Sequence, residues 1–361
     1  MLRHSHDRQP GITRQRIKDN WGYFAPDGSR ITDRDEIDRL NAIALPPAYE
    51  DAWYCPHPNG HVQATGRDAK GRKQYRYHGD FRDKRDAKKY DNTLEFGAAL
   101  PRLRKKVAAD LKGRKLSRDT VLAAVVRLLD TQFLRIGNEQ YAKTNKSFGA
   151  TTLRNRHLKQ EGGRLTMRFT GKHGVVHELP ITDGNLKRIV KKTRELPGQN
   201  LFEYVAEDGS CNPVTSSDVN DYIREASGGE FTAKNFRTWG ATVIAFEQML
   251  EAQEDESLRK VSLKTVLEPV AEALGNTPAI SRKSYVHPKL IEAARENPKA
   301  PLGEFERPRT RKWMSTGEVA LLAYLLKGKR KKARAKPAPV DAAIAAADQG
   351  PSAVDAVAAA A

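Results

Sequence analysis

Residues 117–137, SRDTVLAAVVRLLDTQFLRIG, carry the pattern that decides the class of the larger part of this chain. Ser117 is suited to cap the first turn of a helix through its hydroxyl. The apolar residues behind it recur at helical spacing and predict a helix with one buried face. They are Val121, Leu122, Val125, Leu128, Leu129 and Phe133. We expect Gly137 to end this helix, which would leave Arg135 in its last turn.

Helical patterns also lie on both sides of this segment. One covers residues 93–113 before it. The later ones cover residues 184–195, 216–226, 232–252 and 257–273, and another follows Pro288. The chain after residue 92 is therefore expected to be mainly helical.

A short run of strand patterns interrupts these helices. The patterns are TTLRNRHLKQ at 151–160, RLTMRFTGK at 164–172 and VVHELP at 175–180. Glu-Gly-Gly at 161–163 joins the first two, and the tight Lys-His-Gly at 172–174 joins the last two. Such short polar and glycine-rich connections indicate β-hairpins, so Lys172 is expected at a hairpin tip.

Residues 20–80 carry turn signals at short intervals between strand-like stretches. The signals are Asp-Gly at 27–28, Asn-Gly at 59–60 and Lys-Gly at 70–71. This arrangement predicts a small antiparallel sheet. A short helical pattern within 35–51 should stop at Pro46-Pro47, because proline lacks the amide hydrogen that a helix needs.

These patterns divide the 361 residues into three parts. We expect a small antiparallel β-rich domain at 1–92 and a larger, mainly α-helical domain at 93–326 with a short β-hairpin insert. The stretch 327–361 is basic and then alanine-rich, with almost no large apolar residues, which predicts a disordered tail. The fold class is α+β.

Charge and composition narrow the class of function. Lysine and arginine total 63 against 45 aspartate and glutamate, which gives a net charge of +18 and makes nucleic acid the first partner to consider. Only Cys55 and Cys211 occur, so we expect no disulfide framework. There is no signal-peptide pattern at the start and no apolar run of about 18 residues. We therefore expect a cytoplasmic protein.

The run GRDAKGRKQYRYH, residues 66–78, predicts a basic strand that carries aromatic residues. Alternation places Tyr75 and Tyr77 on one face and Arg76 on the other. A ribbon of this kind can enter a major groove, where Gln74 could read a base edge while cations hold phosphates. The alternative is an exposed edge strand that uses charge against aggregation.

Other chemistries find little support in the sequence. Glycines at 66 and 71 have P-loop spacing, but Arg72 and Lys73 stand where Lys-Ser/Thr would follow. Cys55, His57, His61 and His78 do not match zinc-finger spacing, and no carboxylate cluster of the two-metal nuclease kind is apparent. We expect neither nucleotide hydrolysis nor a metal or other cofactor.

The segment FTAKNFRTWG, residues 231–240, places cations against the helix dipole. With Thr232 as N-cap, Lys234 falls in the first turn and Arg237 one turn later on the same face. The positive N-terminal end of a helix prefers anions, so stability alone would not place cations there. A phosphate bound by backbone amides, Lys234 and Arg237 would resolve this conflict.

Several further motifs, taken in chain order, match one known family. They are Arg135 in LRIGNEQYAK, FGATTLRNRH, Lys172 in FTGK, Lys234 and Arg237 in AKNFRTW, and Tyr285 in TPAISRKSY. With the N-terminal run LPPAYEDAWYCPHPNGHVQATGRDAKGRKQYRYH, residues 45–78, the chain resembles the type IB DNA topoisomerases of the compact poxvirus and bacterial branch. The resemblance covers about residues 10 to 300.

The resemblance implies a C-shaped clamp around supercoiled duplex DNA and a monomeric, nucleoid-associated enzyme. The Tyr285 hydroxyl would attack a backbone phosphate and form a 3′-phosphotyrosyl link, without ATP or metal. Arg135 and Arg237 would hold the non-bridging oxygens, and Lys172 would protonate the departing 5′ oxygen. Lys234 would belong to the same catalytic group. The implied DNA contacts are Gln74, Tyr75, Tyr77, Lys73, Arg72, Arg67 and Tyr141.

Asn276 departs from the pattern of this family, which often has histidine at that position. An asparagine amide can still donate a hydrogen bond to a non-bridging oxygen. It cannot carry the positive charge of a protonated imidazole. We therefore expect activity that is reduced or shifted in pH relative to a histidine version.

Two alternatives remain open from the sequence. A tyrosine recombinase or integrase shares the Arg, Lys, Arg, Tyr chemistry, but its second arginine usually follows a histidine in an HxxR pattern. Here the pattern is Lys234-x-x-Arg237, which favours the topoisomerase. A non-catalytic DNA-binding protein would bind DNA with the same steep salt dependence and would form no covalent link.

Overall fold

The computed structural model describes residues 1–18, 20–255, 257, 260–305 and 308–332. The chain divides into two compact units, residues 1–91 and the residues from Asn92 onward. Helix α2 (Gly79–Asp110) contains this division. No helix in the described ranges is long and apolar enough to cross a membrane.

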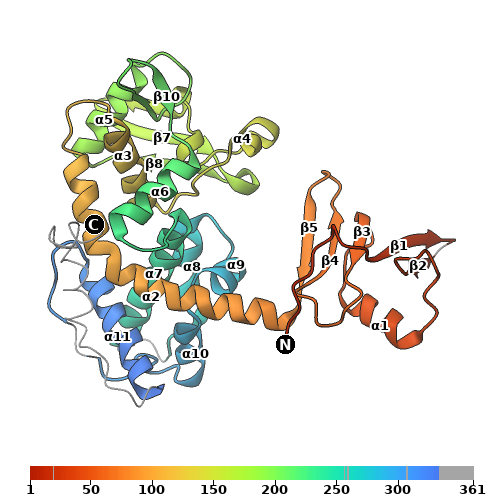
Figure 1. Ribbon diagram of the computed structural model, residues 1–361. Coiled ribbons are helices and arrows are strands. Elements are labelled where there is room, and N and C mark those ends of the chain that lie inside the picture. The colour runs from red at the N-terminus through yellow and green to blue at the C-terminus, as the bar shows by residue number, and fades with distance from the viewer. Residues whose placement is uncertain (19, 256, 258–259, 306–307, 333–361) are drawn as a thin grey trace, which may run out of the picture. The chain divides into compact units, whose positions relative to one another are not determined.

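The N-terminal unit is built on the predicted antiparallel sheet (Figure 1). Its strand order is β2-β1-β3-β4-β5. The strands are β1 (Ile12–Ile17), β2 (Asn20–Phe24), β3 (Glu50–Tyr54), β4 (Val62–Arg67) and β5 (Lys73–Tyr77). Helix α1 (Arg34–Ala42) ends before Pro46 and buries Leu40 against Tyr23 and Tyr54.

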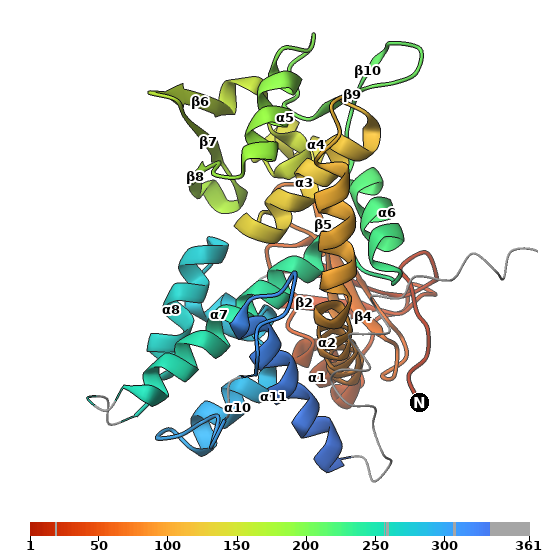
Figure 2. The same ribbon diagram turned by 90° about the vertical axis from the view of Figure 1, so that its left-hand side faces the viewer.

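The second unit is mainly helical, as the sequence predicts. Its further helices are α3 (Arg118–Gln132), α4 (Glu139–Asn145), α5 (Gly184–Arg194), α6 (Ser216–Ser227), α7 (Ala233–Glu254), α8 (Leu263–Leu274), α9 (Pro278–Ser284), α10 (Pro288–Glu296) and α11 (Thr316–Lys332). Helix α3 contacts α5, α6 and α7, and α7 also packs against α8, α10 and α11 (Figure 2). Nine of the 15 residues of α3 are buried, all of them between Thr120 and Leu129, and its contacts with three helices make it the central helix of this unit.

The predicted strand insert forms a three-stranded sheet in the order β6-β7-β8. Its strands are β6 (Leu158–Glu161), β7 (Arg164–Thr170) and β8 (Val176–Pro180). Lys172 lies at the tip between β7 and β8, as predicted, in a single 3₁₀ turn (Lys172–Gly174). Residues 151 and 152, which we expected to begin a strand, belong to another 3₁₀ turn (Ala150–Thr152). A two-stranded ribbon of β9 (Glu203–Val205) and β10 (Cys211–Pro213) completes the strands of the described part.

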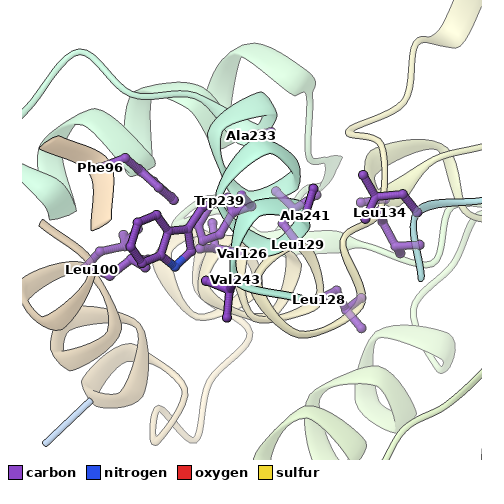
Figure 3. Close-up of a cluster of buried hydrophobic side chains, with 14 of the residues drawn as sticks. Phe96, Leu100, Val126, Leu128, Leu129, Leu134, Ala233, Trp239, Ala241 and Val243 are labelled. Carbon is purple, nitrogen blue, oxygen red and sulfur yellow. The ribbon is translucent and has the colours of Figure 1, made fainter. Parts of the chain in front are cut away.

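Trp239 of α7 is the largest fully buried side chain of the helical unit, and it packs against α2 (Figure 3). Figure 3 shows its indole beside Phe96 and Leu100. The approach is so close that a Cβ on Gly97 would lie 2.3 Å from the Trp239 ring. The indole nitrogen donates a 2.9 Å hydrogen bond to Glu318 of α11, which also pairs with Arg104 of α2. Trp239 therefore links three helices.

The prediction for the end of α3 was wrong. The helix ends at Gln132 rather than at Gly137, and Phe133 adopts a left-handed conformation with φ 49°. Arg135 consequently lies beyond the helix and not in its last turn. Tertiary packing explains the early end, because the Phe133 ring lies against Gly240 of α7, where a Cβ would be 2.1 Å from the ring.

Three other helix boundaries also differ from the sequence prediction. Helix α2 begins at Gly79, well before residue 93, and α8 begins at Leu263, where Ser262 caps it, rather than at residue 257. Helix α11 continues to Lys332, so residues 327–332 are helical and not part of a disordered tail. The rest of the predicted tail, 333–361, lies outside the described residues.

Candidate active site

Four of the predicted catalytic side chains come together in the helical unit. Arg135 comes from the segment after α3, and Arg237 from α7. Asn276 lies in the turn between α8 and α9, and Tyr285 directly follows α9. Asn276 and Tyr285 flank the same short helix, but Arg135 and Arg237 come from distant parts of the sequence, so the fold itself assembles the group.

Arg237 is the most buried member, with only 4% of its surface exposed. Its guanidinium donates hydrogen bonds to the carbonyl oxygen of Phe133 and, at 2.8 Å, to that of Leu274. No carboxylate pairs with it among the described residues, and its Nε is buried without a partner. A buried charge that lacks a counter-ion is costly, so this arrangement favours a site for an anion.

Arg135 and Asn276 are joined directly. Arg135 Nη2 donates a 2.8 Å hydrogen bond to Asn276 Oδ1, while Asn276 Nδ2 is buried without a partner. Gly275 caps α8 in a left-handed conformation with φ 58°, which only glycine adopts easily. The following amide, that of Asn276, donates back to the carbonyl oxygen of Ala271 at 2.9 Å. This turn fixes the asparagine, and Nδ2 is left as a spare donor.

Tyr285 is half-buried and faces Arg237, whose guanidinium carbon lies 5.1 Å from the centre of the tyrosine ring. Burial alone raises the pKa of the Tyr285 hydroxyl. The positive charges of Arg237, Arg135 and Lys234 outweigh burial and leave this pKa below its ordinary value. The site therefore stabilises the phenolate, the nucleophilic form of tyrosine, relative to an ordinary tyrosine.

The two predicted lysines are both exposed. Lys234 lies in the first turn of α7, where its charge acts on Tyr285. Lys172, at the tip of the β7–β8 hairpin, makes no hydrogen bond or ion pair within the described part of the chain. Of the amides at the start of α7 that we expect to bind an anion, that of Ala233 donates to the Asn220 side chain at 3.0 Å, and the expectation stays a prediction.

Sequence reasoning missed Thr242, which is fully buried in α7. Its single hydroxyl hydrogen is shared between the carbonyl oxygens of Thr238, at 2.7 Å from Oγ1, and of Tyr285, at 3.3 Å, and Oγ1 accepts from the His287 amide at 3.3 Å. These contacts fix the main chain at Tyr285 and at His287, and they therefore help to hold the Tyr285 side chain in place. A polar residue within the apolar run ATVIAF was the signal that could have found it.

The predicted DNA-contacting residues of the N-terminal unit gather on β4, β5 and the turn between them. Tyr75 and Tyr77 share one face, as alternation predicts, with ring centres 5.9 Å apart and an interplanar angle of 10°. The polar residues nearby are tied to carboxylates: Arg72 and Gln74 to Asp68, Lys73 to Asp7, and Arg67 to Asp51. In the helical unit, Tyr141 of α4 is 50% exposed.

Among the residues that the structure describes, no group of three or more histidine, cysteine, aspartate or glutamate side chains is placed to hold a metal ion. The four converging residues thus offer cationic and amide donors together with one nucleophile.

Comparison with known proteins identifies the class. The family model for the catalytic core of eukaryotic DNA topoisomerase I matches residues 78–307, and the model for the N-terminal domain of bacterial DNA topoisomerase IB matches residues 20–68. Because the first match spans more than half of the chain, the chain belongs to the type IB DNA topoisomerase family.

Individual relatives agree with this assignment. DNA topoisomerase 1B of Acanthamoeba polyphaga mimivirus is 31% identical over 297 residues, which cover 80% of this chain and 88% of the viral protein. DNA topoisomerase 1B of vaccinia virus (strain Copenhagen) is 24% identical over 238 residues, covering 64% and 72%. Among solved structures, the XerH site-specific recombinase bound to difH overlaps 53% of this chain at 17% identity, with a TM-score of 0.32.

Proposed function

We propose that this protein relaxes supercoiled duplex DNA by cutting one strand, letting it rotate and resealing it through a phosphotyrosyl intermediate. One observation carries the proposal. A tyrosine whose pKa is lowered lies beside a buried arginine without a carboxylate partner, and two buried donors next to them, Arg237 Nε and Asn276 Nδ2, are unsatisfied within the described ranges. Buried donors are normally paired, so these two are suited to receive a substrate phosphate.

The proposed reaction exchanges one phosphoester bond for another. The Tyr285 oxygen forms a bond to phosphorus while the bond from phosphorus to the 5′ oxygen breaks. The tyrosine loses its proton, and the leaving 5′ oxygen takes one from Lys172. Religation is the reverse, with the 5′ hydroxyl as nucleophile. Because the phosphotyrosyl link conserves the energy of the phosphodiester, the cycle needs neither ATP nor metal.

Arg135 and Arg237 would hold the two non-bridging oxygens while negative charge accumulates on them. Fixed donors of this kind each contribute about 3 to 4 kcal/mol to transition-state stabilisation. Asn276 Nδ2 would add a neutral donor, and Lys234 would contribute positive charge from the exposed side of α7.

The N-terminal unit would bind the duplex through β5 and its neighbours. Stacked Tyr75 and Tyr77 with Gln74 would face the groove, and Arg67, Arg72 and Lys73 would exchange their carboxylate partners for phosphates. In this proposal the two units close as a C-shaped clamp on DNA. The protein would act as a monomer in the cytoplasm, associated with the nucleoid, and Tyr141 would add a DNA contact.

A plasmid relaxation assay tests the proposal. Purified protein should relax negatively supercoiled plasmid in EDTA without ATP. Addition of SDS during the reaction should trap nicked plasmid covalently attached to protein, and Tyr285→Phe should abolish both results. A wild-type protein that binds plasmid but neither relaxes nor nicks it would instead support the non-catalytic alternative.

A second assay separates relaxation from recombination. A recombinase joins two partner sites, whereas the proposed enzyme acts on a single duplex. A plasmid with no repeated sequence should therefore be relaxed completely, with no exchange of strands between two labelled duplexes.

A further inference from the structure

His177 of β8 lies beside the candidate active site, although no role has been assigned to it so far. Its ring is half-buried and stacks on Phe169 of β7, with ring centres 5.1 Å apart and an interplanar angle of 22°. Neither ring nitrogen has a hydrogen-bond partner among the described residues. The ring is thus held by packing alone.

Two glycines from different segments approach this ring. A Cβ on Gly171 would lie 2.7 Å from His177 Nε2, and a Cβ on Gly275 would lie 3.0 Å from His177 Cε1. Neither backbone leaves room for a side chain against the imidazole. Gly171 has φ −93°, a value that other residues also adopt, so close approach to the ring is the feature that favours glycine there.

Each of these glycines directly precedes a predicted catalytic residue. Gly171 precedes Lys172 at the hairpin tip, and Gly275 precedes Asn276 in the turn after α8. The imidazole therefore contacts the segment with the proposed general acid and also the segment with a proposed phosphate ligand. Without the ring, the hairpin would lose this contact with the α8–α9 turn.

The charged groups that act on this ring are two arginines. Burial, Arg135 and Arg237 lower the pKa of His177 from its ordinary value. Phe169 of β7, Gly171 at the hairpin tip and Gly275 in the α8–α9 turn also lie against the ring, and none of them is charged. Glu178, the next residue of β8, is exposed and pairs with Arg168 at 3.8 Å.

We propose that His177 is a positioning residue, whose ring sets the spacing between the Lys172 hairpin and the Asn276 turn. The inference rests on the proposed DNA cleavage activity and deepens it. His177 needs no contact with the reacting phosphate in this role. Protonation would add a third positive charge beside Arg135 and Arg237 and push the hairpin out of register.

Single-turnover cleavage of a short duplex tests this role, with two versions of the scissile bond. One version has the natural 5′ oxygen, and the other has a bridging 5′ sulfur, which leaves as a thiolate and needs no proton. His177→Ala should slow cleavage at the oxygen by about 10- to 100-fold, the effect of a displaced catalytic group. The sulfur should restore most of this loss, as it should for Lys172→Ala, but not for Arg237→Ala.

His177→Phe provides the matched control, because it keeps a flat ring and removes the titration. It should cleave the oxygen substrate at close to the wild-type rate at pH 7.5. The wild-type rate should fall as pH drops below the ordinary histidine pKa of about 6.5, since His177 is neutral above its lowered pKa. In His177→Phe the part of this acidic fall that exceeds the loss of Tyr285 phenolate should be absent.

The possible results distinguish a failure of the positioning role from a failure of the proposed function. A His177→Ala protein with the wild-type rate on oxygen, or with a defect that sulfur does not relieve, overturns the positioning role, and so does an unchanged acidic fall in His177→Phe. The unfolding midpoint of each variant is measured in parallel, and His177→Gln replaces His177→Ala if the latter does not fold. If wild type cleaves neither substrate, the proposed function itself fails.

Discussion

Arg135 Nη2 donates a 2.8 Å hydrogen bond to Asn276 Oδ1, so the asparagine orients one of the two arginines of the candidate site. The same side chain keeps Nδ2 buried and unpaired. Asn276 therefore holds Arg135 in place through Oδ1 and keeps its own Nδ2 available as a hydrogen-bond donor.

Replacement of Asn276 should separate these two contributions. Asn276→Ala removes both and should slow single-turnover cleavage by about 10- to 100-fold, the cost of one transition-state donor and a misplaced arginine. Asn276→His should cleave faster than Asn276→Ala, and its advantage should grow as pH falls and the imidazole becomes charged. An Asn276→Ala enzyme as fast as wild type would show that Asn276 has no part in the transition state.

The lowered pKa of Tyr285 predicts a specific pH dependence. The fraction of nucleophilic phenolate rises with pH up to the pKa, so the cleavage rate should rise and level off below the ordinary tyrosine value of about 10. The difference in ultraviolet absorbance between wild type and Tyr285→Phe should report the same titration. In Arg237→Ala the Tyr285 titration should move to higher pH. The variant lacks the positive charge that lowers the Tyr285 pKa most, whereas burial still raises this pKa. A difference titration at or above the ordinary value in wild type would contradict this electrostatic account.

Thr242 should be required to hold the nucleophile's backbone. Thr242→Val keeps the shape but leaves the Tyr285 carbonyl and the His287 amide without this partner. We expect a loss of about 1 to 3 kcal/mol in the free energy of unfolding, measured in urea, and slower cleavage with little change in DNA affinity. Thr242→Ser retains the hydroxyl and should restore cleavage. Equal rates for the valine and serine variants would contradict the assignment.

Gly97→Ala should destabilise the protein although alanine favours a helix by about 1 kcal/mol. The new Cβ would lie 2.3 Å from the Trp239 ring, so the buried indole must move, and overpacking of this kind costs about 1 to 3 kcal/mol. Gly184→Ala at the start of α5 is the matched control, because no atom lies within 4 Å of its Cβ position. Thermal unfolding should show a lower midpoint for Gly97→Ala only.

The sequence predicted the fold class and the order of the catalytic motifs, because both depend on local patterns. The strand alternation at Tyr75 and Tyr77 and the cap at Ser117 need only neighbouring residues. The place of Arg135 was wrong because Phe133 leaves the helix to pack on Gly240, which is distant in sequence. The first half of α2 was missed because its charged residues form no apolar face.

In the candidate site, too, residues in local motifs were predicted and residues that depend on distant contacts were missed. Tyr285, Arg135 and Arg237 were predicted from motifs, and the structure brings them together with Asn276. Thr242 contacts Tyr285 and His177 lies against Gly275, and local spacing does not reveal contacts between residues so far apart along the chain. The catalytic roles of Lys172 and Lys234 stay predictions, as do the DNA contacts of β5 and Tyr141.

The two carbonyl groups that bind Arg237 belong to the main chain of Phe133 and Leu274, and a main-chain oxygen is present whatever side chain stands there. Substitutions at these two positions can therefore change the packing around the arginine without deleting either acceptor. Side-chain substitutions at Phe133 and Leu274 would therefore leave both hydrogen bonds to the Arg237 guanidinium possible, and their effects would underestimate how much these bonds stabilise its position. Only an altered backbone path, such as one imposed by proline, would release it.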